Sequence, residues 1–238
     1  MKRRTAMGAL ASLVLGACGG GGGGSAFETA ATAPAPQASA FAGSSNIAAW
    51  GDSHTTGLPG RADVPGYAAL LRQIATGRQV FVGGSAGLTS TQIANLQAAD
   101  NAHDNWVNVF WYGGNNQTQA ATIKADLARS IASLAPGNDR YLVLGVTNQA
   151  TPAERRGGRD YGDIVQLNAD LAAQYGDRFF DVRTHLVGLF DPVNPLDVVD
   201  HGDDVVPASL RADGVHLNAA GYTAVARRVL EIIVAKGW

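Results

Sequence analysis

The sequence contains almost no cysteine, no marked excess of either charge and no apolar run long enough to span a membrane. One cysteine among 238 residues excludes an intrachain disulfide, so packing must stabilise the folded part. The 18 basic and 20 acidic residues give a net charge of −2, and basic residues cluster only at residues 2–4. This distribution predicts no nucleic-acid partner. The apolar stretch at residues 6–16 is shorter than the roughly 20 residues that cross a bilayer.

The N-terminal region has the pattern of a cleavable export signal. The basic residues 2–4 precede the apolar stretch, which ends in Leu15-Gly16-Ala17-Cys18. This ending resembles the lipobox of bacterial lipoproteins, which implies that residues 1–17 are a signal peptide and that Cys18 is lipidated. Gly19 is not Asp, which by analogy with enteric bacteria implies anchoring to the outer membrane. The alternative is an ordinary secretory signal followed by a stray cysteine.

Residues 18–45 differ in composition from the rest of the chain. They are rich in Gly, Ala, Pro, Ser and Thr, and Glu28 is their only charged residue. Such a segment cannot bury enough apolar surface to fold, so we expect a flexible tether. Residues 46–238 are numerous enough for one domain with a sizeable core.

Short apolar runs alternate with longer helical patterns in this domain. The predicted strands lie near residues 47–50, 80–82, 107–112, 141–146 and 179–182, and the predicted helices near residues 65–75, 89–98, 117–134, 161–175 and from 218 onward. This alternation predicts a parallel sheet covered on both faces, in a flavodoxin-like three-layer αβα sandwich with five strands. In such sheets, ligands bind beyond the carboxyl ends of the strands.

Three residues have the chemistry of a serine hydrolase. Ser53 follows the first predicted strand, while Asp213 and His216 lie three positions apart before the last helix. A serine nucleophile needs a base to take its proton and a carboxylate to orient that base. The alternative is that Ser53 and Asp213 only cap local structure and that His216 is structural. The chain ends of the domain must meet if the three are to act together.

Hydrogen-bond donors for an oxyanion are also present at the predicted strand ends. Gly87 lies in a turn before a helix, where a glycine lets a backbone N–H approach a ligand closely. Asn115 follows the third predicted strand, and its amide can donate without bringing charge. The backbone N–H of Ser53 is the third candidate donor.

These motifs together resemble the SGNH (GDSL-like) hydrolase family, whose four named residues are Ser, Gly, Asn and His in four sequence blocks. Ser53 stands in Gly-Asp-Ser, Asn115 in Gly-Gly-Asn-Asn and His216 in Asp-Gly-Val-His. Gly87 stands in Gly-Leu-Thr, which resembles the family's Gly-Asp-Thr, and Gly84 is the alternative. The resemblance implies that Ser53 is the nucleophile, His216 the base and Asp213 its partner. It also implies an oxyanion hole built from Ser53, Gly87 and Asn115.

The chain departs from the family pattern at several positions. Asn116 stands where many members have Asp, Leu88 replaces the Asp after the glycine, and Val82 replaces a frequent Asn. None of these changes removes a catalytic atom, but they leave substrate preference open. His54, next to the proposed nucleophile, has no assigned role, and we expect it to line a pocket or the surface.

Three other functions remain open. Residues 83–87 also fit G-x-S-x-G, the nucleophile elbow of α/β-hydrolases, which would make Ser85 the nucleophile. Some SGNH relatives transfer acyl groups to envelope polysaccharides, and a third alternative is a non-catalytic surface-binding lipoprotein. The expected function is hydrolysis of short-acyl or O-acetyl esters of small molecules or polysaccharides, by a monomer without metal or organic cofactor. We expect solvated loop acids, and no metal site, at residues 191–204 and His201.

Overall fold

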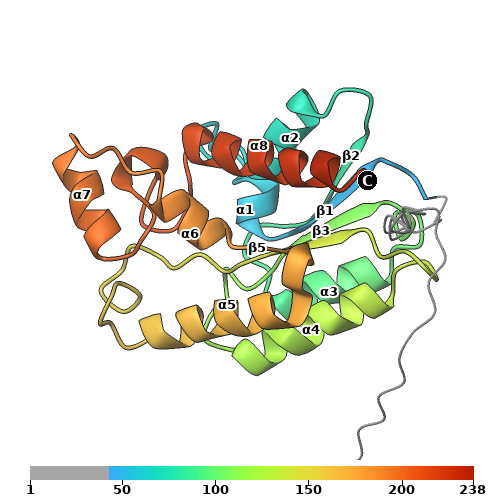
Figure 1. The fold of residues 1–238 in the computed structure, drawn as a ribbon, viewed down its shortest axis with the longest axis horizontal. Helices are drawn as coiled ribbons and strands as arrows, with labels where there is room; N and C mark the ends of the chain where they lie inside the picture. Colours follow the sequence, from blue (N-terminus) through green and yellow to red (C-terminus); the bar gives the residue numbers. More distant parts are fainter. Residues whose placement is uncertain (1–42) are drawn as a thin grey trace, which may run out of the picture. The chain divides into compact units, whose positions relative to one another are not determined.

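The computed structural model describes residues 43–238, shown in colour in Figure 1. The predicted signal peptide at residues 1–17, Cys18 and most of the predicted tether lie outside the described residues and stay predictions. Among residues 43–238, no helix is both long and apolar enough to cross a membrane.

Five parallel strands form one sheet in the order β2-β1-β3-β4-β5. They are β1 (Ile47–Gly51), β2 (Val80–Gly84), β3 (Val107–Trp111), β4 (Tyr141–Leu144) and β5 (Phe179–Phe180). The next strand in the chain, β2, lies on one side of β1, and the following strand, β3, lies on the other side, so the strand order reverses at β1. Ligands bind at such a switch point in open parallel sheets. Ser53 follows β1 and Asn115 follows β3, so both flank this switch point.

Helices cover both faces of the sheet (Figure 1). One face packs against α2 (Tyr67–Ile74), α6 (Val182–Val187) and α8 (Ala219–Ala235), and the other against α3 (Ser90–Ala98), α4 (Ala120–Ala132) and α5 (Tyr161–Tyr175). Residues of β1 alternate between the two cores, because successive side chains of a strand point to opposite faces. Ile47 and Ala49 lie in the first core, while Ala48 and Trp50 lie in the second. The five-stranded three-layer sandwich predicted from the sequence is confirmed.

Local side-chain hydrogen bonds fix the ends of the helices that matter for the site. Asp52 caps the short helix α1 (Ser53–Thr56) by accepting from the His54 N–H at 3.0 Å. Asn218 caps α8 by accepting from the N–H groups of Ala220 and Gly221. The prediction that Asn218 starts the last helix is therefore confirmed.

Two predicted segments differ from the structure. The strand expected at residues 179–182 ends at Phe180, because Asp181 accepts from the Thr184 N–H and starts α6. The acidic segment, expected to be loop-like, contains helix α7 (Pro195–Gly202), which Asn194 caps. The expectation of solvated acids was wrong for Asp197 and Asp200, which are 0% and 3% exposed.

Candidate active site

Ser53 lies at the first position of α1, immediately beyond the carboxyl end of the fully buried strand β1. Its side chain is largely buried, with the residue 5% exposed. The Oγ atom of Ser53 lies 3.0 Å from Nε2 of His216, across 163 positions of sequence. The fold therefore brings the two ends of the domain together at one point, as the sequence hypothesis required.

The turn that carries Asp213 and His216 is enclosed by a β-bridge, directly before the start of α8. The bridge pairs Arg211 with Leu217, and the Ala212 N–H donates to the His216 carbonyl at 2.9 Å. Within this turn, both carboxylate oxygens of Asp213 lie 3.1 Å from His216 Nδ1. One ring nitrogen of His216 thus faces a carboxylate while the other faces a hydroxyl.

Hydrogen bonds also determine the charge of Asp213. Its Oδ1 accepts from the His216 N–H at 2.7 Å and from the Val215 N–H at 2.9 Å. Burial alone would raise the pKa of Asp213, but these hydrogen bonds and the contact with the His216 ring outweigh burial and lower the pKa to about 2. Asp213 is therefore ionised at any pH at which His216 could act as a base, and it can stabilise a charged imidazole ring.

Asp52 holds the amide of Asn115 at the edge of the site. The Asn115 Nδ2 atom lies 3.3 Å from Asp52 Oδ2 and 2.9 Å from the Leu88 carbonyl oxygen. Burial raises the pKa of Asp52 to about 6, against the lowering effect of the N–H groups of His54 and Gly114. The sequence hypothesis gave Asp52 no role, although its place in Gly-Asp-Ser was a signal.

The two candidate glycines differ in what they require of their position. Gly84 ends β2 opposite Gly51, and a Cβ atom on Gly84 would lie 1.9 Å from the Gly51 carbonyl oxygen. Close strand packing thus explains why Gly84 is a glycine. Gly87 is exposed in the turn before α3, with φ of +83° and no atom within 4 Å of an added Cβ. Gly87 adjoins Leu88, whose carbonyl contacts the Asn115 amide, so Gly87 lies beside a second candidate donor.

His54 was expected to line either a pocket or the surface. The structure places it behind the site and not on the surface. The residue is 4% exposed, and its ring stacks on Trp111 with centroids 4.9 Å apart. Its Nδ1 lies 3.4 Å from the Tyr222 hydroxyl, and its ring centroid is 5.8 Å from that of His216. Burial lowers the pKa of His54 to about 3, so this imidazole is neutral at physiological pH.

The alternative sites receive less support. Ser85 is exposed after the edge strand β2, and no hydrogen bond joins it to a histidine among residues 43–238. No group of three or more His, Cys, Asp or Glu residues in the described part of the chain could hold a metal ion. His201 is instead stacked on Phe190, with Nδ1 3.1 Å from the Val187 carbonyl.

Comparisons with known proteins give structural relatives only. No protein-family model and no curated protein sequence matches the chain. A member of the lipolytic protein G-D-S-L family from Veillonella parvula matches with TM-score 0.55 and 17% identity, over 79% of this chain and 98% of its own. The acetyl xylan esterase AlAXEase matches with TM-score 0.57 and 19% identity, over 78% and 98%. TesA matches with TM-score 0.51 and 22% identity, over 80% and 97%.

This chain has the fold of the SGNH (GDSL-like) hydrolases. These three relatives are matched over 97–98% of their own length. At these identities the similarity establishes the SGNH fold alone, and the chemistry must be argued from the site.

Proposed function

We propose that this chain is a serine hydrolase that cleaves carboxylic esters through an acyl-Ser53 intermediate. The observation that carries the proposal is the line of contacts from Asp213 through His216 to Ser53, with distances of 3.1 Å and 3.0 Å. This arrangement matches the geometry by which a base activates a weak nucleophile and a carboxylate orients that base.

The proposed reaction follows from the position of each group. His216 Nε2 takes the hydroxyl proton as Ser53 Oγ attacks the ester carbonyl carbon, while Asp213 holds the Nδ1–H and stabilises the imidazolium. The carbonyl oxygen becomes an oxyanion, which the Asn115 amide and the N–H groups of Ser53 and Gly87 would bind. His216 then gives the proton to the leaving alcohol, and water attacks the acyl-enzyme with His216 again as the base.

A small cavity beside the proposed nucleophile supports a short-acyl or O-acetyl ester as the substrate. A cavity of about 270 Å³ lies between residues 56–65 and residues 84–86, one turn of α1 from Ser53. Arg61 lines this cavity, and its Nη1 lies 3.6 Å from Asp213 Oδ2, which places the cavity next to the proposed triad. The size suits a short acyl group or part of an acetylated sugar.

Hydrolysis of nitrophenyl esters of increasing chain length, beside acetylated xylan, tests this function. We expect turnover to be highest with short acyl groups, and Ser53→Ala to abolish it while Ser85→Ala leaves it intact. The reverse result for the two serines would refute the proposed nucleophile. Adding sugar acceptors separates hydrolysis, which releases free acid, from acyl transfer, which yields an acylated sugar.

We also propose that the protein is a lipoprotein of the outer membrane, anchored through Cys18. The support is the lipobox-like Leu15-Gly16-Ala17-Cys18 and the Gly-rich segment after it. Metabolic labelling with a palmitate analogue should label the protein, and Cys18→Ser should abolish the labelling. Labelling that survives in this variant would refute the anchor.

A further inference from the structure

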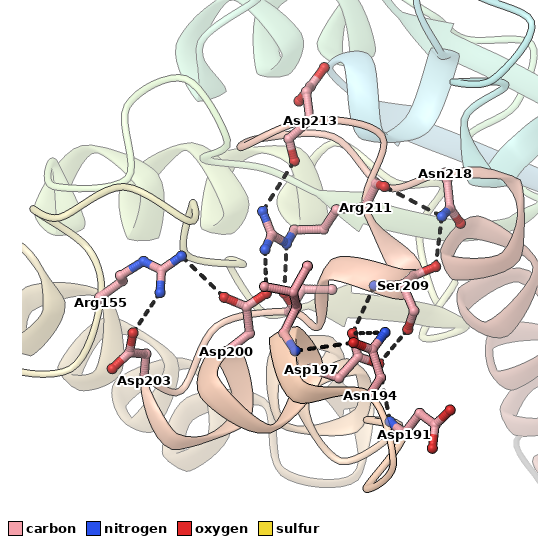
Figure 2. Close-up of polar contacts among 12 residues, drawn as sticks. Arg155, Asp191, Asn194, Asp197, Asp200, Asp203, Ser209, Arg211, Asp213 and Asn218 are labelled. Atoms are coloured by element: carbon pink, nitrogen blue, oxygen red, sulfur yellow. Dashed lines mark hydrogen bonds and ion pairs between the residues drawn. The ribbon is translucent and has the colours of Figure 1, made fainter.

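Helix α7 carries its acidic residues on the inside and its apolar residues on the outside. Asp197 and Asp200 are buried, whereas Leu196 and Val199 are 66% and 57% exposed. Burying a charge costs free energy unless hydrogen bonds and partners compensate, so each buried acid must have specific partners. Figure 2 shows that two of these partners, Ser209 and Arg211, lie on the segment that leads to Asp213.

Asp200 contacts two arginines from different parts of the chain. Its Oδ1 accepts from Arg155 Nη2 at 3.1 Å, and its Oδ2 accepts from Arg211 Nη2. Arg155 is also paired with Asp203 at 2.5 Å, whereas the side chain of Asp200 forms the ion pair with Arg211 (Figure 2). The Asp200–Arg211 pair therefore links α7 to the segment that leads to the turn.

The guanidinium of Arg211 also donates hydrogen bonds to backbone carbonyls before and after Arg211 in the sequence. Its Nε donates to the Val206 carbonyl at 2.7 Å, and its Nη1 donates to the Asp213 carbonyl at 3.4 Å. The donors of a planar guanidinium have a fixed geometry. The contacts of Arg211 with Val206, Asp213 and Asp200 therefore hold the backbone at residues 206 and 213 in one position relative to α7. The Asp213 backbone is thus supported at the residue whose carboxylate faces His216.

Asp197 makes a second connection, to Ser209, two residues before Arg211. It accepts from the Ser209 N–H at 2.9 Å and from the Ser209 hydroxyl at 2.5 Å. The Ser209 carbonyl in turn accepts from Asn218 Nδ2 at 2.8 Å, and Asn218 is the cap of α8. The two buried acids of α7 thus contact Ser209 and Arg211, both before Asp213, and Asn218 after the turn is reached through the Ser209 carbonyl (Figure 2).

We propose that Asp200 and Arg211 are positioning residues, which keep Asp213 and His216 in line with Ser53. The proposal rests on the proposed ester hydrolysis and assigns a function to the acidic segment. A displacement of about 1 Å at a catalytic group can cost on the order of 10²-fold in rate. Loss of the Arg211 fork would move the Asp213 backbone without removing any atom that touches the substrate.

Arg211→Lys in the full-length protein is the main test, because lysine keeps the charge but loses the fork. We expect kcat per folded molecule to fall about 10- to 100-fold with KM changed less than about threefold. We also expect the His216 Nδ1–H proton resonance, which reports the hydrogen bond to Asp213, to move upfield or broaden. Asp203→Asn is the matched control, since it removes a charge from the same segment without touching Arg211, and it should change neither readout.

Asp200→Asn provides a second test if Arg211→Lys does not fold. A kcat within twofold of the wild type, together with an unchanged His216 resonance in a folded variant, would overturn the positioning role. If the wild type hydrolyses no ester, the proposed function fails, and the His216 resonance alone then decides the positioning role. A resonance that shifts in Arg211→Lys but not in Asp203→Asn would support it in that case too.

Discussion

Asp52 and His54 lie on either side of Ser53, and burial reverses the usual order of their pKa values. The pKa of Asp52 is raised to about 6, whereas the pKa of His54 is lowered to about 3. Between these values the folded protein favours a protonated carboxyl group beside a neutral imidazole. The unfolded chain, with pKa values of 3.8 and 6.5, favours the opposite arrangement over much of that range.

His54 is therefore expected to destabilise the fold in acid. Its pKa is lower in the folded than in the unfolded chain, so the unfolded chain binds more protons between about pH 3 and pH 6.5. The contribution of His54 to stability is complete above pH 6.5 and is lost as the pH falls through this window. We predict that the free energy of unfolding of His54→Phe, relative to wild type, increases as pH falls, by at most about 1.4 kcal/mol per unit. Urea unfolding at several pH values tests this. A difference in the free energy of unfolding between the two proteins that stays the same at every pH would contradict it.

Asp52→Asn should show the opposite pH dependence. The pKa of Asp52 is higher in the folded chain, so the folded state binds the additional proton between about pH 3.8 and pH 6, and acid favours folding there. The variant loses this contribution, and its stability relative to wild type should fall as the pH decreases from 6 to 4. The same urea series measures it, with Asp63→Asn, a change at an exposed acid, as the control. A variant whose relative stability did not depend on pH would argue against a raised pKa.

Asn115 and Asn116 are neighbours with different expected roles. Asn115 is exposed at the site, whereas Asn116 is buried and binds the N–H and hydroxyl of Ser90. We predict that Asn115→Ala lowers kcat by about 10²- to 10³-fold with little effect on stability, since it removes an oxyanion donor. Asn116→Ala should instead lower the melting temperature and leave kcat per folded molecule within a few-fold. Equal kcat losses in the two variants would remove the case for Asn115 as a donor.

Gly84 and Gly87 can be separated by alanine substitution. Gly84→Ala would place a Cβ atom against the Gly51 backbone, which cannot move without disturbing β1. We predict that this variant is severely destabilised. Gly87→Ala meets no atom within 4 Å and strains only a positive φ, at a cost of about 1–2 kcal/mol. Because alanine keeps the backbone N–H, a folded Gly87→Ala protein with reduced kcat would show that the proposed donor depends on the positive φ of this turn, and unchanged kcat would show that it does not.

The sheet could be predicted from the sequence because its strands are short apolar runs with clear boundaries. The pairing of Ser53 with His216 was predicted from residue types and from the resemblance to the SGNH family, because His216 lies before a helix and not at the end of a strand. The role of α7 could not be predicted, because Asp197 and Asp200 look like solvated acids until their partners are known. Those partners lie 12 residues from Asp197 and 11 and 45 residues from Asp200, and no local pattern reports such contacts. The burial of His54 was hidden for the same reason, since Trp111 and Tyr222 approach it from distant elements.

Asp213 offers the most direct test of the proposed base. Its two oxygens lie at equal distances from His216 Nδ1, and the carboxylate is ionised because its pKa is about 2. Asp213→Asn keeps an oxygen for the N–H groups of Val215 and His216, so the turn should fold. Its amide can donate to Nδ1, which would place the ring proton on Nε2 and block acceptance of the Ser53 proton.

We therefore predict that Asp213→Asn lowers kcat by on the order of 10⁴-fold at neutral pH, with stability close to wild type. Asp63→Asn is again the control, because Asp63 and Asp213 both contact Arg61 but only Asp213 faces His216. Steady-state hydrolysis of a nitrophenyl ester by both variants measures the difference. A loss of less than tenfold in Asp213→Asn would mean that His216 does not depend on this carboxylate for its tautomer, and the proposed mechanism would need another partner for Nδ1.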